Sequence, residues 1–200
     1  MNSRRRRVVE MAMELAVVSV GPLFLFVLRV AERYSNRRNL RGCNRVGARV
    51  AAGFDLGIDN AGFVSIADDV SFSNGVRLSC YAGGSIKIGK HCFVGDAVKI
   101  VSDRANIWID DDCLVAEQVS IRAGNHGTKS GELIRSQPNA VNDIWIGKDV
   151  WIGKGVAVLA GSHIADGCVI GANSVVMGRT EPNAIYAGAP IRKIAMRSQE

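Results

Sequence analysis

Aliphatic residues recur at every sixth position through the C-terminal part of the chain. The set comprises Ile146, Ile152, Val158, Ile164, Ile170 and Val176. An α-helix, with 3.6 residues per turn, cannot keep a six-residue apolar repeat on one face. A chain wound into coils with three flat sides of six residues can, because each aliphatic side chain then points into one shared core. The repeat therefore predicts a β-solenoid whose neighbouring coils stack at strand spacing.

The same register appears upstream in sets of three. Two sets are clear and one is weaker, namely Ile88, Val94 and Ile100, then Ile109, Val115 and Ile121, and before them Ile66, Phe72 and Leu78. Together they predict about five coils of roughly 18 residues, starting near residues 66, 88, 109, 146 and 164. Three of the five cysteines, Cys92, Cys113 and Cys168, lie four residues after a core aliphatic. We expect them to be small, inward-facing, reduced residues of a cytosolic protein.

This repeat resembles that of the hexapeptide-repeat acyltransferases, and the resemblance covers roughly residues 64–195. It implies an all-β, left-handed parallel β-helix, an exception to the usual right-handed crossover. We expect this domain to span residues 46–195 and to end in a cap at residues 182–195. Because the fold also carries other activities, the repeat predicts the fold better than the chemistry.

A basic, apolar segment precedes the predicted domain. Residues 1–49 hold eleven Arg and three Glu, whereas the remainder of the chain has a slight acidic excess. The uncharged stretch Leu15–Leu28 would span about 21 Å as a helix, too short to cross a bilayer core of about 30 Å. We expect residues 1–45 to form an apolar helical segment whose residues 4–30 contact the inner face of the cytoplasmic membrane, rather than nucleic acid. A secretory signal peptide and a helix packed on the protein itself are the alternatives.

The repeat breaks between residues 122 and 144, where a long loop leaves the coil. Such loops usually carry function. The loop contains Asn125-His126-Gly127 and is followed by Ile144-Trp145-Ile146-Gly147, a pattern that resembles the catalytic segment of the maltose, galactoside and polysaccharide O-acetyltransferases. An imidazole can accept the proton of an attacking sugar hydroxyl near neutral pH, so His126 is the predicted general base. Asn125 and Asp96 are candidate contacts of the acceptor.

The resemblance also implies where an acetyl-coenzyme A donor would bind. In the resembling enzymes its pantetheine arm lies between neighbouring subunits, which implies a homotrimer. Small residues let that arm approach the backbone, an aromatic residue walls the site, and terminal basic residues suit the phosphates of coenzyme A. The implied contacts are Trp151, Gly153, Lys154, Ala172, Arg192 and Lys193.

These observations predict an enzyme that transfers acetyl from acetyl-coenzyme A to a hydroxyl of a sugar or polysaccharide precursor, without a metal. Serine, an antibiotic or the amine of a nucleotide sugar are alternative acceptors. A non-catalytic β-helical scaffold is a different class of function. So is a metal site made by His91, His126 and His163, although the chain lacks the His-x4-His pair of the γ-class carbonic anhydrases.

Overall fold

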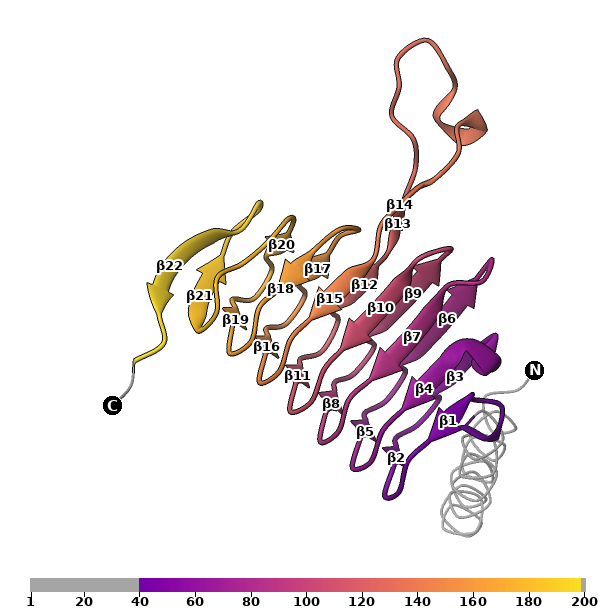
Figure 1. Ribbon diagram of the computed structural model, residues 1–200, viewed down its shortest axis with the longest axis vertical. Coiled ribbons are helices and arrows are strands. Elements are labelled where there is room, and N and C mark those ends of the chain that lie inside the picture. Colours follow the sequence, from indigo (N-terminus) through magenta and orange to yellow (C-terminus); the bar gives the residue numbers. More distant parts are fainter. Residues whose placement is uncertain (1–39, 199–200) are drawn as a thin grey trace, which may run out of the picture.

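The computed structural model describes residues 40–198, which form a three-sided parallel β-solenoid (Figure 1). Each coil gives one short strand to each of three sheets, so strands that pair within a sheet come from successive coils. Residues on the flat sides repeat every six positions, and the architecture matches the predicted left-handed β-helix. Two short 3-10 turns, η1 (Ala61–Phe63) and η2 (Ile134–Ser136), interrupt the strands.

The three sheets are named A, B and C in the order in which each coil visits them. Sheet A contains β1 (Arg45–Val46), β4 (Val64–Ile66), β7 (Ser85–Ile88), β10 (Asn106–Ile109), β15 (Ile144–Ile146) and β18 (His163–Ile164). Sheet B contains β2 (Ala51–Ala52), β5 (Ser71–Phe72), β8 (Phe93–Val94), β11 (Leu114–Val115), β16 (Trp151–Ile152), β19 (Val169–Ile170), β21 (Ala184–Ala187) and β22 (Arg192–Met196). Sheet C contains β3 (Gly57–Asp59), β6 (Arg77–Tyr81), β9 (Lys99–Asp103), β12 (Ser120–Arg122), β17 (Ala157–Val158) and β20 (Val175–Val176).

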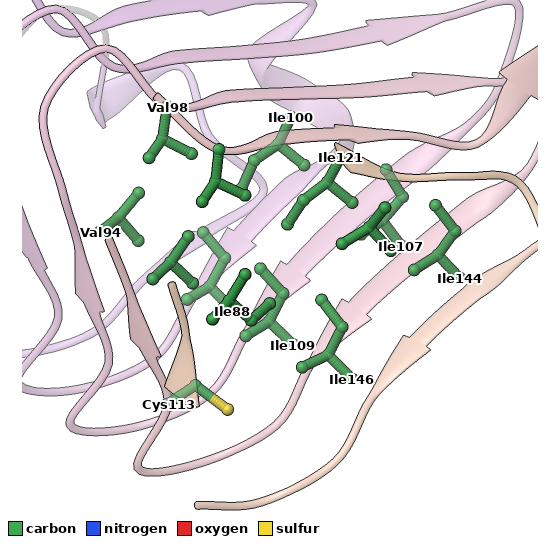
Figure 2. Close-up of a cluster of buried hydrophobic side chains, with 14 of the residues drawn as sticks. Ile88, Val94, Val98, Ile100, Ile107, Ile109, Cys113, Ile121, Ile144 and Ile146 are labelled. Atoms are coloured by element: carbon green, nitrogen blue, oxygen red, sulfur yellow. The ribbon is translucent and has the colours of Figure 1, made fainter. Parts of the chain in front are cut away.

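The predicted core positions stack in columns, as the repeat requires. On sheet A the register places Ile88 beside Ile109, which in turn lies beside Ile146. Figure 2 shows these side chains pointing into a shared interior, together with Ile100 and Ile121 from sheet C. All five are at most 3% exposed. Burial of such columns from every side supplies the main stabilising free energy of the solenoid.

A further coil precedes those that the repeat revealed. It comprises β1, β2 and β3, which pair in parallel with β4, β5 and β6. The residues of this coil that align with the core columns are Val46, Ala52 and Ile58. Ala52 and Ile58 are partly buried, whereas Val46 is exposed. Because Ala52 stands where the next coil has Phe72, the apolar signal of this coil in the sequence is weaker.

The prediction that three cysteines face inward is confirmed. Cys92, Cys113 and Cys168 are each at most 1% exposed and belong to the hydrophobic core. They act as small core residues at corners of successive coils.

A hairpin carries the predicted loop away from the solenoid. Strands β13 (Gly124–Asn125) and β14 (Ala140–Val141) pair antiparallel, and residues 126–139 project beyond them (Figure 1). The chain then rejoins sheet A, where β15 pairs directly with β10. The insertion therefore leaves the stack of coils unbroken and presents the loop on a rigid base.

The C-terminal strands β21 and β22 form an antiparallel hairpin at the end of sheet B. Ile191, between them, is only 8% exposed and packs with the core. The predicted helical segment and its membrane contact at residues 4–30 lie almost wholly in residues 1–39, outside the described residues. Over residues 40–198, no helix is long and apolar enough to span a membrane.

Candidate active site

The base of the projecting loop forms a pocket of about 400 Å³ that contains the predicted base. Three segments meet there: the end of β9, the end of β12, and the two strands of the hairpin. Pairing of Asn125 with Ala140 brings the residues that flank this pair, His126 and Asn139, to the same end of the hairpin. The pocket is lined by Asp103, Arg122, Gly124, Asn125, His126 and Asn139. The structure thus brings both predicted loop residues, Asn125 and His126, into one site.

Asp103 is a pocket residue that the sequence analysis missed. Its Oδ2 accepts a hydrogen bond of 2.9 Å from the side chain of Asn139. That hydrogen bond, together with the neighbouring Arg104 and Arg122, holds the pKa of the Asp103 carboxyl below its usual value. An ionised carboxylate therefore lies in the same pocket as His126. In the sequence, Asp103 is marked only by lying one coil before the loop. Its closeness to the loop becomes clear once β9 is paired with β12.

The loop is held in shape by the side chain of Gln137, which is only 7% exposed. Its Oε1 accepts a hydrogen bond of 2.8 Å from the backbone N–H of Lys129, and its Nε2 donates to the carbonyls of Lys129 and Glu132 at 2.9 and 3.0 Å. A methyl group at Gly127 would lie 2.8 Å from Gln137 Cβ and Oε1. The glycine after His126 therefore lets the glutamine amide brace the loop next to the pocket.

Asp96 lies elsewhere. It follows β8 at the corner between sheets B and C, and its Oδ1 accepts hydrogen bonds from the hydroxyl of Ser73 and, at 2.8 Å, from the N–H of Asn74. These bonds lower the pKa of the Asp96 carboxyl. Within one chain, Asp96 tethers a corner to the preceding coil and is not among the residues that line the His126 pocket.

Four of the predicted donor contacts gather at sheet B and its corner with sheet C. Trp151 points outward from β16 and is 53% exposed. At the corner, a methyl group on Gly153 would lie 2.8 Å from the backbone N of Ala172, so successive coils approach closely there. Lys154 Nζ lies 3.3 Å from Glu117 Oε1 of the coil before.

The two basic residues of the cap lie on β22, at the end of the same sheet. Lys193 Nζ lies 2.6 Å from Glu181 Oε2, and this hydrogen bond raises the pKa of Lys193. Arg192 is exposed and its Nη1 donates to the carbonyl of Ile191 at 3.0 Å. Both side chains therefore carry a positive charge, but Glu181 partly offsets the charge of Lys193.

Sheet C separates the predicted base from the predicted donor contacts within one chain. The loop of His126 leaves the corner between sheets C and A, whereas Gly153, Lys154 and Ala172 occupy the corner between sheets B and C. The six residue steps from Gln118 to Gly124 connect the two edges on one coil, which is roughly 20 Å at strand rise. One chain therefore does not unite the two groups of residues.

The three histidines also lie apart. His91 sits at a corner with Nδ1 3.7 Å from Asp69 Oδ2, and His163 stacks on Trp145 with ring centroids 6.3 Å apart. His126 lies in the loop pocket. Over residues 40–198, no three His, Cys, Asp or Glu side chains are grouped so as to hold a metal ion.

Known proteins are similar to this chain in sequence and in fold. The family described as bacterial transferase hexapeptide (six repeats) matches residues 143–178. A putative lipopolysaccharide biosynthesis O-acetyl transferase of Escherichia coli, WbbJ, is 34% identical over 74% of this chain and 79% of its own length. Galactoside O-acetyltransferase of the same organism is 36% identical over 56% of this chain and 54% of its own length.

Among solved structures, the N-acyltransferase AntD from Bacillus cereus, in complex with dTDP and 3-hydroxybutyryl-CoA, superposes with a TM-score of 0.72. It is 20% identical and covers 82% of this chain and 89% of its own. A hexapeptide-repeat acetyltransferase from Vibrio cholerae superposes with a TM-score of 0.59 over 94% of both chains, at 18% identity. At such identities the likeness concerns the fold. The repeat, the stacked columns and the extended match to WbbJ together show that this chain belongs to the hexapeptide-repeat transferases and is an acyltransferase of that family.

Proposed function

We propose that this protein transfers acetyl from acetyl-coenzyme A to a hydroxyl group of a sugar or polysaccharide precursor. The observation that carries the proposal is the loop-base pocket, which combines His126 with an ionised carboxylate at the point where the inserted hairpin leaves the solenoid. Two of the relatives named above, WbbJ and galactoside O-acetyltransferase, are described as O-acetyltransferases. Their likeness supports a hydroxyl of a carbohydrate as the acceptor.

In the proposed reaction, His126 accepts the proton of the acceptor hydroxyl while its oxygen attacks the thioester carbonyl. Collapse of the tetrahedral intermediate breaks the C–S bond, and the proton on the imidazolium passes to the departing thiolate. Coenzyme A and the acetyl ester are the products. The ionised Asp103 lines the same pocket as His126.

We propose a homotrimer, which the resemblance to the family implies, and the position of the predicted residues on opposite edges of sheet C supports a site built between two copies. His126 of one copy can meet the corner of Gly153, Lys154 and Ala172 only if that corner belongs to a second copy. Such a contact joins two different surfaces of the same chain, and a heterologous contact closes into a ring when the rotation between copies is a whole fraction of a turn. Three copies around an axis would then build three equivalent sites, each with the base from one chain and the donor contacts from its neighbour.

We include in the proposal a peripheral contact of residues 4–30 with the inner face of the cytoplasmic membrane. The arginines that flank the apolar stretch support it, because anionic lipid headgroups attract them while the apolar side chains enter the interface. Co-flotation of the full chain with vesicles that contain anionic lipid tests this, and loss of co-flotation is expected when Arg4–Arg7 are replaced by serine. Equal flotation of both proteins would contradict the contact.

The transferase itself is tested by calorimetry with acetyl-coenzyme A and by an assay of coenzyme A release with sugar acceptors. We expect His126→Ala to bind acetyl-coenzyme A as the parent does but to lose transfer by at least a hundredfold, in the range of general base catalysis. His91→Ala, which alters an exposed histidine at a corner, is the matched control and should keep its activity. Failure of the folded parent to bind acetyl-coenzyme A, or full transfer by His126→Ala, would refute the proposal.

The same assay distinguishes O- from N-transfer. It is run with a sugar that carries only hydroxyl groups and with its amino-sugar counterpart. Faster turnover of the hydroxyl acceptor is expected. The reverse preference would make the protein an N-acetyltransferase with the same base.

A further inference from the structure

The outward column of sheet A changes from polar to aromatic along the solenoid. The register stacks Arg45, Ser65, Lys87, Trp108, Trp145 and His163 in that order. The rings of Trp108 and Trp145 have centroids 5.0 Å apart at an interplanar angle of 37°, and His163 stacks on Trp145 at 21°. Outward positions of a sheet face solvent in this chain, so three aromatic rings form a continuous strip on its surface.

A pocket of about 290 Å³ lies over this column. Both tryptophans line it, and charged side chains stand around it, among them Arg45, Lys87 and Asp110. A flat apolar floor with hydrogen-bonding groups at its edge suits a ligand that is apolar on its faces and polar on its rim. A pyranose ring has this character, because its C–H groups can lie against the negative face of an indole while its hydroxyls point sideways.

Cross-strand pairing alone does not account for the arrangement. Aromatic residues opposite each other on neighbouring strands stabilise a sheet by their mutual contact. Such a pair needs no pocket, yet Trp145 remains 43% exposed. The pocket over the two indole rings is also lined by side chains of both charges. The exposed area of indole is the part that a ligand can cover.

The position of the tryptophans links them to the loop-base pocket. Trp108 lies on β10, in the coil that ends at the inserted hairpin, and Trp145 lies on β15, the strand that follows the hairpin and pairs with β10. The starts of these strands are tied by a hydrogen bond of 2.7 Å from the N–H of Asn106 to Asp143 Oδ1. Trp108 follows Asp103 of the His126 pocket by five positions, so their backbones lie at most about 17 Å apart. A short glycan can span that distance.

We propose that Trp108 and Trp145, here called the tryptophan platform, bind sugar units of the acceptor that are distant from the hydroxyl being acetylated. The inference rests on the proposed function, and it narrows the acceptor to an oligosaccharide or polysaccharide. Lys87 and Arg45 at one end of the platform suit acidic sugars or bridging phosphates in such a chain. A monosaccharide that occupies the His126 pocket cannot also cover the platform.

The experiment is binding of the full-length protein, without acyl donor, to a printed array of neutral and anionic oligosaccharides, followed by fluorescence titration with the best-bound glycan. The double variant Trp108→Leu/Trp145→Leu keeps apolar contact between the strands but removes the indole faces. We expect it to bind at least tenfold more weakly, about 1.4 kcal/mol. Phe93→Leu, which removes an exposed ring from sheet B, is the matched control and should bind as the parent does.

A second variant guards against misfolding of the first. Lys87→Ala changes an exposed side chain at the edge of the platform and is expected to weaken anionic glycans selectively. The platform is overturned if no glycan on the array binds the folded parent, or if both variants bind as the parent does. Because His126→Ala should still bind glycans, loss of transfer and loss of platform binding are separate results. If only the platform is wrong, the parent still binds acetyl-coenzyme A and acetylates a small sugar.

Discussion

Replacement of Gln137 by alanine is expected to open the projecting loop without destabilising the solenoid. The side chain is nearly buried and makes three hydrogen bonds to the backbone of Lys129 and Glu132. All three bonds join one part of the loop to another, and Gln137 is not part of the hydrophobic core. The variant should therefore change the local equilibrium between the closed and open loop and leave the cooperative unfolding of the coils unaltered.

The magnitude follows from the three bonds. At about 1 kcal/mol each, their loss removes about 3 kcal/mol from the closed state of the loop. Since each 1.4 kcal/mol changes an equilibrium constant tenfold, the open population should rise roughly a hundredfold. His126 lies at the base of this loop, so transfer activity should fall together with loop closure.

Limited digestion with trypsin measures the effect, because Lys129 and Arg135 are exposed cleavage sites within the loop. Where opening and closing are faster than cleavage, the rate of cleavage follows the open population. We expect cleavage at Lys129 to accelerate by up to about a hundredfold, while the urea midpoint of the solenoid stays the same. Ser136→Ala, at an exposed neighbour in the same turn, is the control. Equal cleavage rates in the parent and the alanine variant of Gln137 would refute the bracing role.

Three further outcomes are expected. Ile121→Ala, at a fully buried column position, should cost about 2–5 kcal/mol in free energy of unfolding, measured with urea, and a loss well below 1 kcal/mol would contradict the packing. Asn139→Ala should raise the pKa of Asp103, measured by NMR titration of its carboxyl. Because the hydrogen bond depresses the folded-state pKa, its stabilisation is present above the unfolded value of about 3.9 and is lost as the pH falls through the folded-state pKa. Glu181→Gln should tighten binding of acetyl-coenzyme A in calorimetry, since Lys193 is charged in both proteins but no longer has a carboxylate beside it that competes with phosphate; weaker binding would remove Lys193 from the donor site.

The columns of the core could be predicted because the inward-facing positions of a β-solenoid recur at a fixed spacing in the sequence. Each aliphatic from Ile146 to Val176 has the same environment as the residue one coil away, so local sequence and global position agree. The buried cysteines follow from the same register. The first coil was not predicted, although Val46 and Ile58 follow the six-residue spacing, because the small Ala52 stands between them in place of a large apolar residue.

The loop could be located for a related reason, since an interruption stands out against a strict period, and His126 could be singled out within it. The two residues that complete this site in the structure, Asp103 and Gln137, could not be predicted. Asp103 reaches the pocket through pairing of β9 with β12, and Gln137 closes the loop through contacts with residues five and eight positions away. Neither residue has a distinctive neighbourhood in the sequence.

The sequence by itself thus determined the solenoid, its inward-facing residues and the place where the chain leaves it, because these depend on a repeat that each segment carries locally. Only the tertiary structure decided which side chains share a surface. It placed Asp103 in the His126 pocket, set the predicted donor contacts on the far edge of sheet C, and brought the ring of Trp108 against that of Trp145, 37 positions further along the chain. The physical reason is that the winding of the solenoid brings together residues one coil apart. An insertion changes the number of residues between two such positions without changing how the coils stack.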